Sequence, residues 1–199
     1  MRRLSSLIVV AALLFAACNN NKKPDGITIV SDNGKEKVTV DMNKMEKASA
    51  EMQKLTEDLQ KLPPLTLDQL KAMIPEELMG GKRSSYNATS AMGAGVVNAE
   101  YKINDSTDIK LMVYDCAGPG GAGIYSMQYL GMFNMESENE HEYTKTIDFN
   151  GGKAIEKCQK DRNDCSLTYF TGSRFLVELE GDNVGIDGLK QAANSLKIK

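Results

Sequence analysis

The chain has 199 residues, 24 of them Lys or Arg and 27 Asp or Glu, so its formal net charge is −3 at pH 7. This mild acidity argues against a nucleic-acid-binding protein, which would carry an excess of basic residues. The single His excludes a histidine-rich metal site, and 41% hydrophobic beside 26% charged residues is typical of a globular chain.

The N-terminal segment, residues 1–17, has the pattern of a secretory signal peptide. Two arginines give it a positive start, and the apolar run over residues 7–14 is too short to span a bilayer. Residues 15–18 read Phe-Ala-Ala-Cys and resemble a lipobox, the motif at which a bacterial lipoprotein is cleaved and its Cys acylated. We therefore expect Cys18 to carry acyl chains such as palmitate, which anchor the protein in a membrane. A plain secretory signal is the alternative interpretation.

Residues 18–26 are polar and show no periodicity, so we expect a flexible tether between the lipid and the folded part. Asn19, directly after Cys18, resembles the residue found in lipoproteins that are sorted to the outer membrane. The predicted location is therefore the bacterial cell envelope, with a lipid anchor in the outer membrane.

The next segment, residues 27–62, is predicted to form a hairpin and an amphipathic helix. Residues 27–30 and 37–40 favour strands, and an Asn-Gly pair between them is a strong turn signal. A helix should follow over residues 43–62, because apolar side chains recur there at steps of three and four. The stripe consists of Met45, Ala48, Met52, Leu55, Leu59 and Leu62. It either packs on the body of the same protein or pairs with a second copy as a short coiled coil.

Residues 63–199 are predicted to form one α+β domain. Thr66 and Gln69 match a capping box, which predicts a short helix. Further helices are predicted over residues 124–135 and after Asp187, which would be an N-cap. Strands are predicted over residues 84–91, 97–103, 109–113, 144–149, 153–159, 166–170 and 174–180. Because the turns between them are short, we expect an antiparallel sheet of about six or seven strands packed by helices, in an α/β/α sandwich-like arrangement.

A glycine-rich segment between a predicted strand and a predicted helix is the first candidate site. Gly118, Gly120 and Gly123 have the spacing of a dinucleotide fingerprint. The preceding strands look antiparallel rather than parallel, which argues against a nucleotide, and no cofactor is expected. The segment is either a simple connecting loop or a mobile loop that binds a partner or ligand through its backbone N–H groups. The residues of this candidate loop are Asp115, Cys116, Gly118, Gly120, Gly121 and Gly123.

Three cysteines remain once Cys18 is assigned to the lipid. Cys158 and Cys165 flank a charged turn between two predicted strands, so we expect a cross-strand disulfide. Cys116 would then be an unpaired, buried structural thiol. The alternatives are a different disulfide that includes Cys116, or a reactive thiol with His141 as its base, which is a low-ranked enzymatic interpretation.

Two further groups of residues have both an ordinary and a functional interpretation. Residues 138–142 combine three Glu with His141, but a charged loop is usually only solvated, and no metal site is predicted. The predicted helix over 124–135 is rich in Met and aromatic side chains, which either fill an ordinary core or line a pliable groove for a lipid or peptide. These side chains are Tyr125, Met127, Tyr129, Met132, Phe133 and Met135.

Residues 65–80, LTLDQLKAMIPEELMG, resemble the LKALLPEELPG-like opening of an uncharacterised family of exported bacterial lipoproteins. The similarity continues to the C-terminus and includes a GRFLVEVEG-like strand at residues 172–181. It implies no catalytic residue, because that family has no assigned activity. The expected topology is also similar to the PsbP/Mog1-like sandwich of non-catalytic accessory proteins, a likeness at the level of the fold.

Together these features predict a membrane-anchored envelope lipoprotein that acts as a non-catalytic interaction or accessory module for a protein partner. The alternative is a carrier or sensor of an apolar, lipid-like ligand in the Met- and Tyr-lined groove. Neither a nucleic acid nor a metal is expected as a ligand, and self-association through residues 43–62 is a further prediction.

Overall fold

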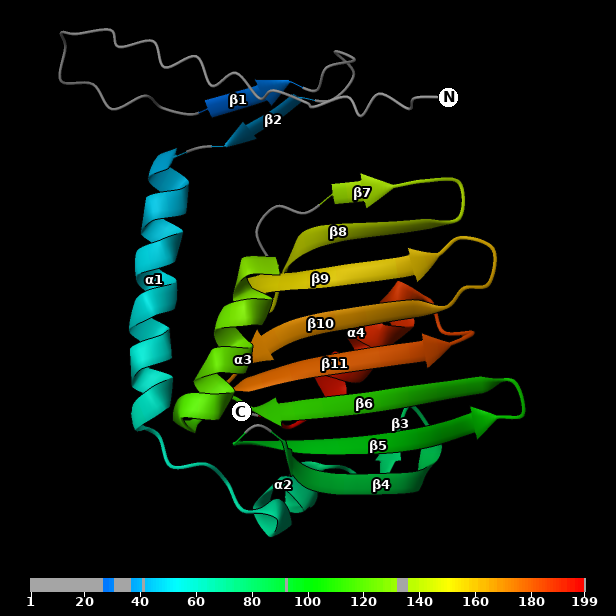
Figure 1. Ribbon diagram of the computed structural model, residues 1–199. Helices are drawn as coiled ribbons and strands as arrows, with labels where there is room; N and C mark the ends of the chain where they lie inside the picture. The colour runs from blue at the N-terminus through cyan, green and yellow to red at the C-terminus, as the bar shows by residue number, and fades with distance from the viewer. Residues whose placement is uncertain (1–26, 31–36, 41, 92, 132–135, 199) are drawn as a thin grey trace, which may run out of the picture. The chain divides into compact units, whose positions relative to one another are not determined.

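The structure is a computed structural model (Figure 1). It describes residues 27–30, 37–40, 42–91, 93–131 and 136–198. The predicted signal peptide, Cys18 and the tether lie outside these residues. The chain forms two compact units, which part between Lys47 and Ala48.

The first unit contains a two-stranded antiparallel sheet of β1 (Ile27–Val30) and β2 (Lys37–Val40). These are the two strands of the predicted hairpin. Both are rich in Val, Ile and Thr, whose branched side chains favour extended backbone.

The second unit is built on an open antiparallel sheet of nine strands, in the order β3-β4-β5-β6-β11-β10-β9-β8-β7. The strands are β3 (Glu77–Leu78), β4 (Gly81–Ala91), β5 (Ala94–Asn104), β6 (Thr107–Asp115), β7 (Glu136–Glu138), β8 (Glu142–Phe149), β9 (Gly152–Gln159), β10 (Cys165–Thr171) and β11 (Phe175–Asp182). The α+β class is as predicted, but six or seven strands was too few. The two additional strands, β3 and β7, have two and three residues and lie at the sheet edges, so neither is long enough to show an alternating pattern.

Four helices are described: α1 (Met42–Lys61), α2 (Leu67–Met73), α3 (Gly118–Gly131) and α4 (Ile186–Ser195). The predicted capping box of α2 is present, because the Thr66 hydroxyl accepts the Gln69 N–H and the Gln69 side chain accepts the Thr66 N–H. The prediction that Asp187 caps α4 was wrong. Gly185 is the N-cap and makes no side-chain cap, while Asp187 lies in the first turn, where its charge favours the helix dipole.

The glycine-rich segment is the first part of α3, so the prediction of a loop there was also wrong. A Cβ on Gly121 would lie 2.4 Å from the carbonyl carbon of Cys116 and 2.5 Å from the carbonyl oxygen of Asp115. The helix therefore approaches the end of β6 more closely than any residue but glycine permits. Glycine normally disfavours helix, and this close packing explains why the helix forms in spite of it.

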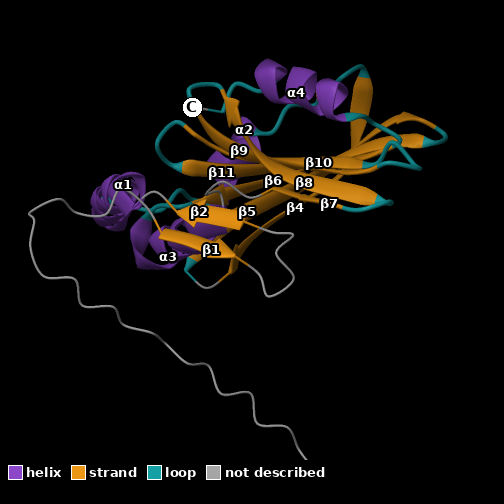
Figure 2. Ribbon diagram, turned by 90° about the horizontal axis from the view of Figure 1, so that it is seen from above, coloured by secondary structure: helices purple, strands orange, loops and turns teal. Residues whose placement is uncertain are grey.

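Helices lie against both faces of the sheet (Figure 2). The larger core packs α2 and α4 against one face, with Leu70 and Leu189 among its buried side chains. The smaller core lies on the opposite face and consists of Leu59, Cys116, Ala122, Tyr125 and Leu176, with partly buried neighbours. Successive side chains of a strand point to opposite faces, so one strand serves both cores.

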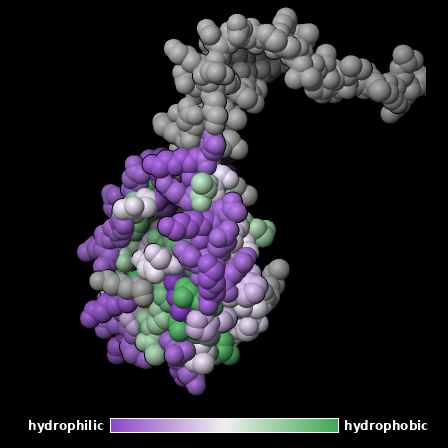
Figure 3. All heavy atoms as spheres, turned by 90° about the vertical axis from the view of Figure 1, so that its left-hand side faces the viewer, coloured by the Kyte–Doolittle hydropathy of each residue, from purple (hydrophilic) through white to green (hydrophobic). Residues whose placement is uncertain are grey.

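The C-terminal half of α1 packs on the smaller core. Met52 and Leu55 are half-buried and Leu59 is fully buried there, while the Thr56 and Ser126 hydroxyl oxygens lie 2.9 Å apart. The outward side of this helix is hydrophilic (Figure 3). Met52, Leu55 and Leu59 of the predicted stripe thus pack within the same chain. The side chains of Met45 and Ala48, the first two residues of the stripe, lie outside the described residues. No helix in the described part of the chain is long and apolar enough to cross a bilayer.

Candidate functional site

The predicted partner loop begins with Asp115, whose carboxylate is fully buried at the end of β6. Arg174 Nε donates to Oδ1 at 2.7 Å and Nη2 donates to Oδ2 at 2.9 Å. The backbone N–H groups of Leu65 and Ala117 donate to the same carboxylate, at 2.6 and 3.1 Å. Burial raises the pKa of Asp115, but Arg174 and these N–H groups lower it by more, so the pKa lies below its ordinary value. Asp115 is thus bound within the protein and is not free for a ligand.

The Asp115–Arg174 pair also fixes the connection between α1 and α2. Arg174 Nη2 donates to the Pro63 carbonyl oxygen at 2.8 Å, and Leu65 follows two residues later with its bond to Asp115. We call these four residues the clamp. The clamp joins the α1–α2 connection and the turn before β11 to the end of β6, which is a structural role.

Cys116, the next residue, is a fully buried free thiol in the smaller core. Burial raises the pKa of its thiol to about 12. A nucleophilic cysteine needs a lowered pKa and access to substrate. His141 lies in the turn between β7 and β8, at the end of the sheet opposite to the end of β6 (Figure 1). The structure therefore does not bring the proposed thiol and base together.

Gly118, like Gly121, lies where a side chain would clash with its neighbours, whereas Gly123 does not. Gly118 has a φ of +74°, and a Cβ there would lie 2.9 Å from Pro64 Cγ. Gly120 Cα lies 3.7 Å from the position of a Cβ on Gly93, in the turn between β4 and β5. Gly123 faces open space. The structure therefore brings the predicted loop residues together, but they form a packed junction between α3 and the sheet instead of an open binding loop.

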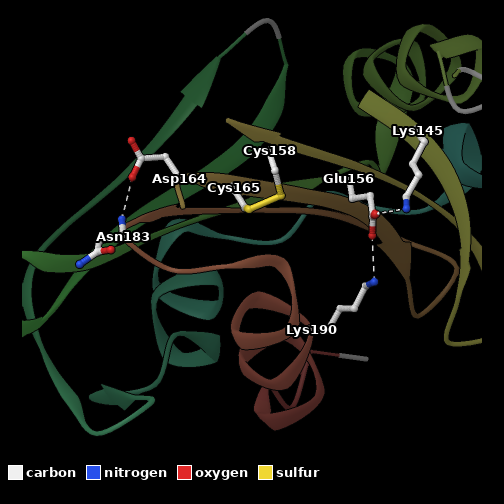
Figure 4. Close-up of a disulfide and its surroundings, with 7 residues drawn as sticks. All are labelled: Lys145, Glu156, Cys158, Asp164, Cys165, Asn183 and Lys190. Carbon is white, nitrogen blue, oxygen red and sulfur yellow. Dashed lines mark hydrogen bonds and ion pairs between the residues drawn. A yellow bond between two sulfur atoms is a disulfide. The ribbon is translucent and has the colours of Figure 1, made fainter. Parts of the chain in front are cut away.

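Cys158 and Cys165 lie directly opposite each other on β9 and β10 and form a disulfide, as predicted (Figure 4). Their Cα atoms are 4.1 Å apart. Nearby, the carboxylate of Asp164 accepts the backbone N–H of Asn183 at 2.8 Å, which ties the β9–β10 turn to the chain after β11.

A buried carboxylate that the sequence analysis missed lies near the disulfide. Glu156 is 2% exposed, and its two oxygens lie 2.9 Å from Lys145 Nζ and 2.8 Å from Lys190 Nζ (Figure 4). Burial raises the pKa of Glu156, but the two ammonium groups lower it by more. The sequence pattern indicated this burial: Ala154, Glu156 and Cys158 are every second residue of β9, so their side chains point to the same face of the sheet.

The charged segment 138–142 is a solvated turn. Glu138 pairs with Lys160, and Glu142 pairs with Lys157 at 2.9 Å. In the described ranges, no group of His, Cys, Asp and Glu is arranged to hold a metal ion. A hollow of about 410 Å³ beside this turn is lined by Asn139, His141, Glu142, Gln159, Asp161 and Arg162.

Side chains fill the space where the predicted apolar groove would begin. The rings of Tyr125 on α3 and Phe170 on β10 have centroids 4.6 Å apart, and Leu59 and Leu176 pack beside them. Met127 points away, with 76% of its surface exposed. Residues 132–135, which carry two of the predicted groove methionines, lie outside the described residues.

The remaining candidate is a part of the sheet on the α1–α3 side that no described helix covers. These two helices lie over only one end of that face (Figures 1 and 2). At the other end, β5, β6 and β11 present three cross-strand rows of polar side chains, which we call the open face. The rows are Asn98–Met112–Glu178, Glu100–Lys110–Glu180 and Lys102–Asp108–Asp182. Sequence analysis had treated these residues only as the solvent-facing half of alternating strands.

The open face contains a shallow hollow of about 220 Å³. It is lined by Asn98, Ala99, Glu100, Lys110, Leu111, Met112, Glu178 and Glu180. Burial and the neighbouring Glu180 raise the pKa of Glu178. A half-buried carboxylate beside a second one is therefore the main electrostatic feature of this surface.

No protein-family model, curated protein or solved structure matches the chain. The function is therefore inferred from the residues and their geometry.

Proposed function

We propose that the protein is a membrane-anchored envelope lipoprotein whose second unit is a non-catalytic interaction module. The observation that carries the proposal is the open face, a part of the central sheet that no described helix covers. The opposite face of the same strands packs into the larger core. Antiparallel sheets commonly leave one face to solvent, and this face is the surface that we assign to a protein partner.

Export is supported by two independent features. Residues 1–18 have the signal and lipobox pattern, and a disulfide such as Cys158–Cys165 is more common in an oxidising compartment than in the cytosol. Anchoring at the outer membrane and membership of the resembling lipoprotein family are parts of the same proposal. The helices on both faces of the sheet are compatible with the α/β/α arrangement of PsbP/Mog1-like accessory proteins, a likeness of fold only.

The alternatives have less support. A carrier of an apolar ligand needs a groove beside α3, where Tyr125, Phe170 and Leu176 pack against one another. A thiol enzyme needs an accessible Cys116, which is fully buried.

Site-specific crosslinking in living cells tests the module. A photoreactive residue at Ser85 or Ser166, which flank the open face on β4 and β10, should yield a discrete protein adduct. The same residue at Gln191, exposed on α4, is the control and should yield none. Absence of adducts at Ser85 and Ser166, or equal adducts at Gln191, would contradict the proposal.

The anchor is tested separately by fractionation. Cys18→Ser should move the protein from the membrane fraction to the soluble fraction of the envelope. Retention of this variant in the membrane would contradict lipidation at Cys18.

A further inference from the structure

We infer that the open face docks a cationic segment of a partner protein, which it recognises through Arg or Lys side chains. This inference rests on the proposed interaction module and specifies the chemistry of its partner.

Acidic side chains dominate the open face. Its nine positions include two lysines and five carboxylates, which are Glu100, Asp108, Glu178, Glu180 and Asp182. The surface therefore has a net negative charge. A patch of one sign attracts a partner of the opposite sign and orients it during encounter.

The two lysines of the open face do not neutralise its central carboxylates. Lys102 Nζ lies 3.2 Å from Asp105, and Lys110 Nζ lies 3.9 Å from Asp182. Glu178 and Glu180 have no ion pair with any residue that the structure describes. Glu100 and Asp108 likewise have no ion pair with a described residue, so four of the five carboxylates are not neutralised by a lysine.

Hydrogen-bond acceptors surround the hollow in the open face. Asn98 Oδ1 is buried and has no hydrogen-bond donor among the described residues. It lies on β5, while Glu178 and Glu180 lie on β11, so acceptors line both sides of the hollow and Met112 lies between them on β6. A guanidinium group has five donors and no acceptor, and its aliphatic stem packs well on a thioether. About 220 Å³ is room for the end of one such side chain.

The electrostatics of Glu178 point the same way. Burial and Glu180 raise its pKa, which means that its charge is poorly compensated in the free protein. A cation placed beside it would compensate the charge. Anionic lipid head groups would be repelled by the same surface, so we assign the partner to protein rather than membrane.

Binding of a hexa-arginine peptide to the purified full chain, measured by calorimetry, tests the inference. The double variant Glu178→Gln/Glu180→Gln should bind the peptide at least tenfold more weakly than the unmodified chain. The matched control, Glu77→Gln/Glu140→Gln, removes two exposed carboxylates elsewhere and should change affinity less than twofold. Urea unfolding of both variants would show that they remain folded.

Several outcomes would overturn the inference. No binding to the unmodified chain, or an equal loss in the control, would mean that the open face does not select cations. Saturable binding of Ca²⁺ that the double variant loses would assign the surface to a metal ion. A concentration-dependent dimer that the double variant loses would assign it to a second copy of the chain.

The two proposals fail separately. Crosslinks at Ser85 and Ser166 without selective hexa-arginine binding would overturn the cationic partner and leave the interaction module in place. Selective peptide binding without crosslinks in cells would overturn the module as the cellular function.

Discussion

Arg174 and Asp115 illustrate how a single buried pair organises this protein. The guanidinium group donates through Nε and Nη2 to both carboxylate oxygens and to the Pro63 carbonyl oxygen. A buried pair of this kind adds little over an apolar packing, but removal of one partner leaves the other charged, buried and unpaired.

The first prediction concerns this pair. Arg174→Ala should lower the free energy of unfolding by about 3 kcal/mol or more, because Asp115 loses its counterion. Arg162→Ala, at an exposed position, is the control and should change it by less than about 0.5 kcal/mol. Urea unfolding curves measure both. Similar curves for the two variants would show that the clamp is not stabilising.

The second prediction concerns Glu178. Its pKa is higher in the folded than in the unfolded chain, so its ionised form destabilises the fold. The destabilisation is fully present at a pH above the pKa of Glu178 in the folded chain, and it is absent at a pH below the ordinary pKa of a Glu side chain. Glu178→Gln should therefore raise the free energy of unfolding at pH 7 modestly, by less than about 1 kcal/mol, and leave it unchanged near pH 3. A decrease at pH 7 would contradict the prediction. Glu77→Gln serves as the exposed reference.

Sequence reasoning found Asp115 and Cys116 but could not assign their roles. The partner of Asp115 is Arg174, far away in the chain, and only the fold brings the two together. Glu156 was missed because a charged residue in a strand is usually assumed to face solvent, whereas its two lysine partners come from β8 and α4.

At the level of elements, α3 shows a conflict between local propensity and packing. Four of its first six residues are glycine, which predicts a loop, yet the segment is helical. Close approach to the end of β6 outweighs the propensity, and no local pattern reveals that approach. Strands with clear alternation and the capped helix α2 were predictable because their signals are local.

The third prediction separates two glycines of α3. Gly121→Ala should destabilise the protein by about 1–3 kcal/mol, because its Cβ would overlap the backbone of Cys116. Gly123→Ala meets no atom within 4 Å and should stabilise it by about 0.5–1 kcal/mol through helix propensity. Thermal unfolding of both variants measures the difference. A shift of both in the same direction would argue against the close helix–strand packing.

For the whole molecule, the α+β class followed from the alternation of apolar residues, whereas the open face did not. Alternation shows which side chains of a strand share a face, but not how far α1 and α3 extend over that face. The position of a helix on a sheet depends on contacts between distant segments, such as Leu59 with Leu176. That is why the open face emerged only from the structure.

The fourth prediction concerns the disulfide, which joins residues separated by seven positions. Loop-entropy reasoning gives a contribution of about 2.5 kcal/mol for so short a loop. Replacement of Cys158 and Cys165 by Ala should lower the unfolding free energy by about that amount. A reductant should lower it similarly in the unmodified chain and have no effect on the variant. An unmodified chain insensitive to reductant would contradict the disulfide.

The clamp also determines how the protein responds to tension. A pull on the N-terminal end of the chain reaches the second unit through α1, whose C-terminal half is held mainly by apolar side chains. We expect this helix to peel away at low force and Pro63 and Leu65 to bear the load next, at the clamp. Single-molecule pulling should therefore show two successive rupture events, and Arg174→Ala should weaken the second. Because β5, β6 and β11 are held together by their own strand pairing, the open face should keep its shape while the helix is stretched away.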